Sequence, residues 1–362
     1  MVFFIYRFII FILFSVCFYS CSVSSLSLDV VRPAEIDVPN HIQDIIIINR
    51  SLPSKGNQVQ NVLDGILSGE GIGDDKKGSL NCVNGVFNIL NIKDDNVSRF
   101  NLVNADGFTN GDYFKGTGTS EFPTPIKWKK INKVFQDYNV DALVVLETFD
   151  SQSSILNGGT VERIKFINKK KTKVTLIEAI LNIEVQAGWR IYDVKNEKII
   201  DEKKFLDQKS FTSTGSTFEY AKQNLPKKKD AICQTGEFAG QQYAFRISPK
   251  KDRVKRNFYI HASKSSKDAN VAFKNASRSL RDRNFDKAAA IWQNFVQNEN
   301  EEIAGRACFN MALASELKNN YNLAIEWIKK SIYYNNKKAE NYFIILKNRK
   351  TEIKRVEKQL KK

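Results

Sequence analysis

The first half of the chain alternates between short apolar runs and stretches with helical periodicity. Each apolar run is bounded by polar residues, as in strands that are buried on both faces of a sheet. The apolar runs are 45–48, 100–103 and 141–147, and the helical stretches are 58–67, 79–90 and 126–138. Strands and helices that alternate in this way predict an α/β layer.

Farther along, the pattern changes to a strict alternation of apolar and polar residues. It runs from Leu181 to Tyr192 and predicts a strand with one buried face. A turn is expected at 193–198, a returning strand from Ile199, and a third antiparallel partner at 173–179. Helices at 218–224 and 230–243 and a last strand at 258–260 complete the pattern. The sequence therefore predicts a mixed sheet with helices, an α/β domain that covers residues 31–262.

Beyond residue 262 the periodicity is helical, and it repeats after thirty-six residues. Phe285-Asp286-Lys287-Ala288 recurs as Tyr321-Asn322-Leu323-Ala324, and Ala276, Trp292 and Phe295 align with Ala312, Ile328 and Ser331. Small residues at helix crossings and an aromatic residue at the turn resemble the tetratricopeptide repeat, whose usual length is about 34 residues. Both units lack the Trp-Leu-Gly start of that family, and Ser315 replaces its usual first-helix aromatic. We expect an all-α domain of tetratricopeptide-like helical hairpins over 263–362, closed by a lysine-rich capping helix.

The first twenty residues are almost wholly apolar, with one basic residue at Arg7. The apolar run is shorter than the roughly 20 residues that a membrane span needs, and it matches the core of a secretion signal. It ends at Ser20-Cys21, which resembles the bacterial lipobox, although the two preceding residues are bulkier than usual. We predict a signal peptide at 1–20, a lipid on Cys21, and a flexible lipidated tether over 21–30. The alternatives are an uncleaved signal anchor and cleavage without a lipid.

Cysteine usage and net charge narrow the possible functions. Cys82, Cys233 and Cys308 are widely spaced, and the whole chain has two histidines, so we predict buried thiols and neither a metal site nor a cofactor. A formal charge of +16 would suggest nucleic acid in a cytoplasmic protein. An exported protein is separated from the chromosome. Its lysine runs also lack the neighbouring aromatic side chains on which nucleic-acid bases would stack. We therefore expect a solvated basic surface, which would help a lipid anchor to hold an anionic membrane, and no nucleic-acid partner.

The sequence contains no recognisable catalytic motif. Gly69, Gly71 and Gly73 lack the spacing of a dinucleotide loop, and the adjacent carboxylates Asp74-Asp75 and Asp94-Asp95 fall in predicted polar loops. Glu147 and Asp150 follow the strongest predicted strand, where ligands of open α/β sheets bind. A structural cap or surface charge is the more ordinary explanation of both. We therefore assign no catalytic, cofactor-binding or metal-binding residue.

These features together resemble a group of uncharacterised bacterial lipoproteins that is catalogued as a domain of unknown function. In that group an opening of the form PAE…P…I…NR leads into an α/β region and then into tetratricopeptide-like helices. Here the opening is Arg32-Pro33-Ala34-Glu35, followed by Pro39, Ile42 and Asn49-Arg50. The resemblance implies an outer-membrane lipoprotein that faces the periplasm, and it implies no activity.

Two functions of different classes fit this sequence. The first is a non-catalytic scaffold or adaptor that is held to the membrane by its lipid and binds envelope proteins through the concave face of its repeats. The residues expected on that face are Asn270, Ser277, Arg281, Arg306 and Glu316. The second is an envelope glycan-binding protein or hydrolase that uses Glu147 and Asp150. A deep pocket with a second carboxylate near Glu147 would favour the hydrolase, and a lysine partner would remove its support.

Overall fold

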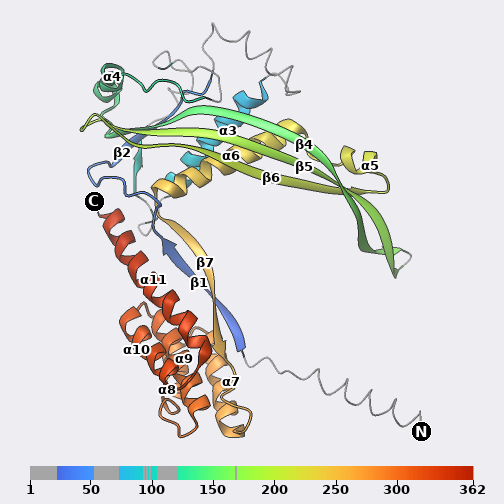
Figure 1. Ribbon diagram of the computed structural model, residues 1–362, viewed down its shortest axis with the longest axis vertical. Helices are drawn as coiled ribbons and strands as arrows, with labels where there is room; N and C mark the ends of the chain where they lie inside the picture. Colours follow the sequence, from blue (N-terminus) through green and yellow to red (C-terminus); the bar gives the residue numbers. More distant parts are fainter. Residues whose placement is uncertain are drawn as a thin grey trace. The chain divides into compact units, whose positions relative to one another are not determined.

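The computed structural model describes residues 23–52, 73–92, 94, 97, 99–103, 114, 121–167 and 169–361, which form two compact units (Figure 1). The α/β unit comprises Pro33–Lys250 together with the chain from Val356 onward. The helical unit comprises the described residues up to Arg32 together with Lys251–Arg355. The predicted fold class, a mixed sheet with helices followed by a run of helices, is confirmed. The predicted signal peptide, Cys21 and the expected helix over 58–67 lie outside the described residues.

The α/β unit is built on a five-stranded sheet with the strand order β3-β2-β4-β5-β6. The strands are β2 (Asp44–Asn49), β3 (Asn101–Leu102), β4 (Ala142–Ile167), β5 (Lys170–Asp193) and β6 (Lys198–Gly215). Strand β2 runs parallel to β3 and to β4, whereas the β4–β5 and β5–β6 pairs are antiparallel. The sheet is therefore mixed, as the sequence predicts.

Four consecutive isoleucines explain why helices cover both faces of this sheet. Side chains of a strand alternate between its faces, so Ile45 and Ile47 enter one core while Ile46 and Ile48 enter another. The first core lies under α3 (Asp74–Leu90) and α6 (Lys228–Ile247), where the rings of Trp189 and Tyr243 stack at 4.6 Å. The second lies under α4 (Trp128–Tyr138). A short helix, α5 (Phe218–Gln223), follows β6.

Strands β4 and β5 are much longer than the sequence predicts, at 26 and 24 residues. The expectation of a separate strand at 173–179 is wrong, because β5 continues through it without a turn. The pairing of β4 with β5 extends to Ile167 and Lys170, and the chain reverses at Lys169, whose φ is 64°. Lysines and threonines near the reversal hide the apolar–polar alternation that marks the rest of β5.

Helices α3 and α6 approach closely through glycines. A Cβ atom on Gly240 would overlap the carbonyl oxygen of Cys82, and one on Gly85 would overlap that of Glu237. Glycine is used at such positions because any side chain would separate the two backbones. The helix pair over the first core therefore depends on the absence of side chains at two crossing points.

The helical unit combines a two-stranded sheet with five helices (Figure 1). Its elements are β1 (Val23–Arg32), β7 (Lys250–Tyr259), α7 (Lys267–Arg281), α8 (Phe285–Gln293), α9 (Glu301–Leu317), α10 (Tyr321–Tyr333) and α11 (Lys337–Leu360). The boundary predicted near residue 262 is displaced to Lys250, because Phe258 and Tyr259 of β7 belong to the core of the helices.

The expectation of a flexible tether over 21–30 is wrong for its described part. Residues from Val23 form β1, in which Leu26, Leu28 and Val30 turn inward while Ser25 and Ser27 are exposed. The alternation has the two-residue period of a strand, but its serines resemble those of a linker. Pairing with β7 supplies the hydrogen bonds that a free tether would lack.

The thirty-six-residue repetition is present in the structure. Helices α8 and α10 start thirty-six residues apart, and each is capped by an asparagine, Asn284 or Asn320, whose side chain accepts a hydrogen bond from the backbone three residues later. The aligned positions Ala276, Ala312, Trp292 and Ile328 are all fully buried. The repeated sequence therefore marks repeated packing.

We expect Gly240→Ala to destabilise the chain by about 3 kcal/mol, because the added methyl group must push α6 away from α3. Urea unfolding of the purified chain, followed by circular dichroism, measures this loss. Asn84→Ala, on an exposed position of α3, is the control and should change stability by less than about 0.5 kcal/mol. Equal stability of both variants would contradict the close helix contact.

Candidate functional site

Glu147, the leading site candidate from the sequence, is fully buried at the end of the β2–β4 pairing. A shift in the β4–β5 register between Leu146 and Thr148 places it at a bulge, which re-aims its side chain. Its Oε2 accepts a 2.7 Å hydrogen bond from Nη1 of Arg50, and its Oε1 accepts a 2.5 Å bond from the hydroxyl of Tyr192. Nη1 of Arg190 lies 3.4 Å from Oε1. Two guanidinium groups and a phenol therefore enclose the carboxylate.

The same arginines attach the segment before α4 to the sheet. Arg50 donates to the carbonyl of Thr124 at 3.0 Å, and Arg190 donates to that of Pro123 at 2.7 Å. The guanidinium of Arg190 also lies 4.7 Å above the ring of Phe122. These contacts stabilise the loop that leads into α4.

Two groups of this network, Tyr192 and Arg190, have raised pKa values. Burial and the adjacent carboxylate of Glu147 raise the pKa of Tyr192, so its hydroxyl stays a donor. Burial lowers the pKa of Arg190, but its hydrogen bond to Glu202 and the charge of Glu147 outweigh this and raise it. Glu147 has no solvent-facing surface on which to receive a substrate.

The other acidic candidates also have structural positions. Asp150 is half-buried and lies opposite Gln186 in the β4–β5 register. Asp74 and Asp75 were expected in a loop, but they form the first turn of α3, where negative charge favours a helix start. Asp75 also accepts a 2.5 Å hydrogen bond from the hydroxyl of Ser151. Gly69, Gly71 and Asp95 lie outside the described residues.

The three cysteines that the structure describes are free thiols. Cys82 and Cys308 are buried and Cys233 is half-buried. Burial raises the pKa of all three, that of Cys308 to about 11, which keeps them protonated and weakly nucleophilic. Within the described part of the chain, no three His, Cys, Asp or Glu side chains gather as metal ligands, and no helix is long and apolar enough to span a membrane.

The face on which we expected partner-binding residues is occupied by the chain's own strand β7. Glu316, whose side chain is fully buried, accepts hydrogen bonds from Nε and Nη2 of Arg256 at 3.0 and 2.9 Å and from the hydroxyl of Tyr342 at 2.6 Å. Asn310 exchanges two 2.8 Å hydrogen bonds with the backbone of Tyr259. Strand β7 thus fills part of the surface that a ligand was expected to use.

The remaining predicted partner-binding residues also have contacts within the chain. Asn270 accepts hydrogen bonds from the backbone of Ala262 and Ser263, and Ser277 is buried and donates to a carbonyl of its own helix. Arg281 donates to Ser24 of β1 at 3.0 Å, and Arg306 donates to the carbonyl of His261 at 3.2 Å. The structure therefore gives all five side chains an intramolecular role, and their predicted partner-binding role stays a prediction.

An exposed hairpin, which sequence reasoning missed, is the most prominent surface of the α/β unit. Pairing of β5 with β6 ends at Ile177, so residues 160–167 of β4 and 170–176 of β5 form a two-stranded arm (Figure 1). A register shift at Asn157 and Gly159 precedes it, and Gly159 has a φ of 81°, which favours glycine. The arm spans about 20 Å at the usual rise of a strand.

Apolar and basic side chains share one face of this arm. Ile164 and Phe166 are 63% and 69% exposed, and they lie opposite Lys173 and Lys171 in the register. The ammonium of Lys171 lies 5.9 Å from the ring of Phe166. Exposed apolar side chains at a sheet edge are typical of binding surfaces, because they offer both contact area and unpaired backbone groups.

Comparison with known families also divides the chain into two parts, but its first part ends at residue 259 and therefore includes β7. Residues 42–259 match a family described as domain of unknown function DUF8603, which covers more than half of the 362-residue chain. The chain belongs to the DUF8603 family. Residues 274–356 match a second domain of unknown function, DUF6340. No protein with a curated description matches the chain.

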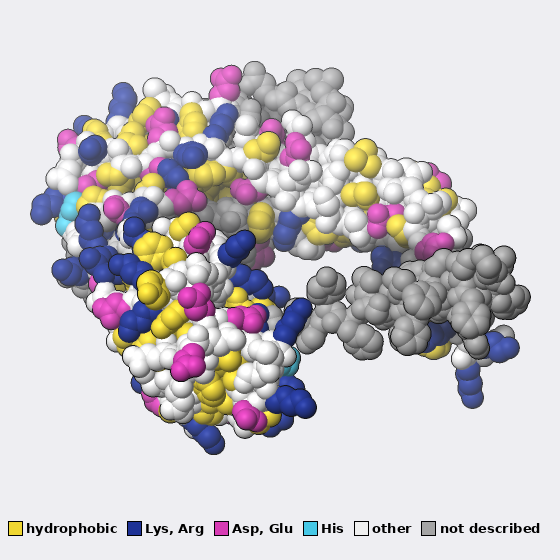
Figure 2. All heavy atoms as spheres, turned by 60° about the horizontal axis from the view of Figure 1, so that its bottom comes forward, with side chains coloured by type: hydrophobic (Ala, Val, Ile, Leu, Met, Phe, Trp, Pro, Cys, Tyr) yellow, Lys and Arg dark blue, Asp and Glu magenta, His cyan; other side chains and the backbone are white. Residues whose placement is uncertain are grey.

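Charged side chains of both signs lie on the surface of the protein. On the face shown in Figure 2, Lys and Arg side chains are scattered among acidic and polar ones. Exposed pairs such as Lys173 with Glu162, 3.1 Å apart, contribute little to stability. Among the DUF8603 residues that the structure describes, the arm is therefore the surface with the clearest binding chemistry.

One carboxylate of the DUF8603 region is held at a cost in stability. Asp207 lies on β6 opposite Val185, and burial raises its pKa. Its Oδ2 is buried without a hydrogen-bond partner among the described residues. Because the folded-state pKa lies above the unfolded value, ionisation of Asp207 disfavours folding at neutral pH, and this cost disappears as pH falls through the folded-state pKa.

We expect Asp207→Asn to raise the free energy of unfolding at pH 7 by about 1 kcal/mol, the scale of one unsatisfied buried group. The gain should shrink as pH falls through the folded-state pKa, where wild-type Asp207 takes up its proton. Urea titrations at several pH values measure it, and the exposed Asp282→Asn serves as the control. A gain that is constant with pH would show that the carboxylate charge is not its cause.

Proposed function

We propose that this protein is a non-catalytic adaptor of the bacterial cell envelope. A lipid on Cys21 would anchor it to the outer membrane on the periplasmic side, and its folded units would bind other envelope proteins. The exposed arm is the main support for this proposal. Its apolar side chains Ile164 and Phe166 are 63% and 69% exposed, and binding to another protein would bury them.

The helical unit supports the same function. Its thirty-six-residue repetition and capped helix pairs are those expected of tetratricopeptide-like repeats, which present extended surfaces to other proteins. Since strand β7 fills the face that holds Glu316, we place partner binding on other surfaces of this unit and on the arm.

The hydrolase alternative receives no support from the site. Glu147 is enclosed by Arg50, Arg190 and Tyr192, and Glu202, the nearby carboxylate, is bound to the same Arg190. A glycosidase needs one carboxyl group that gives up a proton and a second that faces the substrate. Here both acids are engaged in ion pairs, so the adaptor is the better explanation.

Labelling and crosslinking in cells test the adaptor. Cells receive an alkyne fatty acid and produce wild type, Cys21→Ala, or chains with a photo-crosslinking amino acid at Phe166 or, as a control, at Val271 of α7, which is 58% exposed. We expect fatty-acid label on wild type and none on Cys21→Ala. We also expect a discrete crosslinked envelope protein from position 166, at least fivefold weaker from position 271.

Each part of this experiment has an opposing result. Wild type without label would remove the lipid anchor, and the N-terminus would then be a signal anchor or a plain secretion signal. Equal crosslinking from positions 166 and 271 would show that the arm has no specific partner. Loss of the specific crosslink in Ile164→Ser, which changes the neighbouring exposed residue on the same face, would strengthen the assignment.

A further inference from the structure

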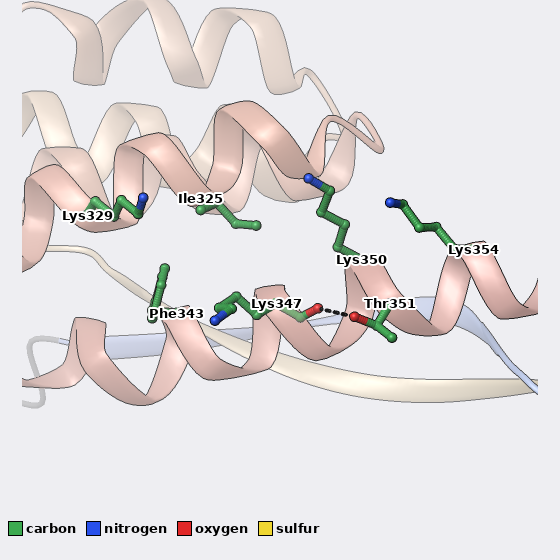
Figure 3. A pocket seen from close by; sticks show the side chains of 7 residues that line it. All are labelled: Ile325, Lys329, Phe343, Lys347, Lys350, Thr351 and Lys354. Atoms are coloured by element: carbon green, nitrogen blue, oxygen red, sulfur yellow. Dashed lines mark hydrogen bonds between the residues drawn. The ribbon is translucent and has the colours of Figure 1, made fainter.

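A basic groove runs between α10 and α11 in the helical unit (Figure 3). Its volume is about 380 Å³. Ile325 and Phe343 are partly buried against the core and form an apolar floor. The lysines that line it are Lys329, Lys347, Lys350 and Lys354. Figure 3 shows Phe343 and Lys350 pointing from α11 towards α10.

These lysines have no acidic partner among the residues that the structure describes. Lys329, Lys347 and Lys354 are exposed and Lys350 is half-exposed, and Lys347 lies 5.5 Å from the ring of Phe343. Four cations therefore border an apolar floor, over about 16 Å of helix between residues 343 and 354. Such a surface complements an anionic ligand that also has an apolar side.

The repeat explains why this groove is open. Helix α11 begins at Lys337, thirty-six residues after the start of α9, and therefore occupies the place of a third first helix. In the earlier pairs the chain turns after Arg281 and Leu317 and adds a second helix. The corresponding turn would fall near residue 353, but α11 continues without a break to Leu360. The second helix of a third pair is thus missing at this position.

Equivalent positions one repeat earlier support the interpretation that a helix-packing surface is left open here. Ala307, Met311 and Ala314 of α9 are buried in helix packing. Thirty-six residues later the same positions hold Phe343, Lys347 and Lys350, which line the open groove. The site has the geometry of a helix-packing surface, but its chemistry has changed from two alanines and a methionine to an aromatic ring and two lysines.

We propose that the α10–α11 groove binds an acidic amphipathic helix of a partner protein, which completes the third helix pair. This inference rests on the proposed adaptor function and names its partner class. A rod-shaped occupant fits a groove about 16 Å long, and its apolar residues would cover Ile325 and Phe343 while its carboxylates meet the lysines. A flat membrane surface would reach the lysines but not the floor between them.

Peptide binding to the intact purified chain tests the groove. The probe is a fluorescent sixteen-residue synthetic helix with leucines on one face and glutamates beside them, followed by anisotropy. Two matched peptides replace the glutamates by lysine or the leucines by serine. Lys347→Glu/Lys350→Glu should weaken binding at least tenfold, whereas Lys267→Glu/Lys287→Glu, with the same charge change on exposed sites of α7 and α8, should change it less than twofold. Circular dichroism verifies that both variants fold.

Specific results would overturn the proposal. Equal weakening by both double variants would mean that only overall charge matters. Equal binding of the serine peptide would mean that the groove takes a polyanion without an apolar side. Binding to phosphatidylglycerol vesicles that depends on Lys347 and Lys350, with no peptide binding, would assign the surface to the membrane.

Failure of this inference is distinguishable from failure of the adaptor function. If the crosslink from Phe166 persists in cells while the acidic peptide does not bind, the adaptor stands and the groove is a solvated cap of the repeats. If the peptide binds as predicted, a photo-crosslinker placed at Lys350 should map to an acidic helical segment of a partner. Mapping to a basic or extended segment would contradict the proposed occupant.

Discussion

The buried ion pair between Arg256 and Glu316 is the interaction on which the helical unit depends. Two guanidinium nitrogens lie within 3.0 Å of a carboxylate that no solvent reaches, and the hydroxyl of Tyr342 completes its hydrogen bonds. Burial and the charge of Glu316 raise the pKa of Tyr342 well above its usual value, so this phenol stays a donor. Removing one partner of such a pair typically costs about 3–5 kcal/mol, because the other charge is left buried.

This ion pair decides which surfaces remain for other molecules. It attaches β7 to α9 and α11, and Asn310 holds the end of the same strand through its backbone. The face of α9 that holds Glu316 is then part of the core of the helical unit.

The α/β unit uses buried charge in the same way. Glu147 binds two arginines that also hold the loop before α4, so its carboxylate organises the fold and is not available for chemistry. In both units a buried carboxylate is bound by arginine and tyrosine side chains that come from other elements of the same unit.

Local patterns predicted much of this architecture. The isoleucine run predicted a strand buried on both faces, and the thirty-six-residue repetition predicted the helix pairs, because both patterns record packing against near neighbours. Strand β1 could not be predicted, because its serines mask the alternation and its stability comes from pairing with β7, more than two hundred residues away.

The contacts that the five predicted partner-binding residues make within the chain could not be predicted for the same reason. A repeat register shows which side chains face inward, but not that β7 returns to cover Glu316 and Asn310. The arm was missed because its lysines hide the strand pattern near Lys169. The helical pattern of α11 is continuous in the sequence. Its importance follows only from comparison with α7 and α9, which end at the position where α11 continues.

Hydrogen exchange of the β7 amides tests the central claim most directly. If β7 is part of the helical core, the amides of residues 256–259 in the intact chain should exchange as slowly as those in the middle of α9. Mass spectrometry of peptic fragments resolves the two segments. Exchange of β7 within seconds, beside a protected α9, would mean that the strand leaves the face of Glu316 open to partners and would contradict this account.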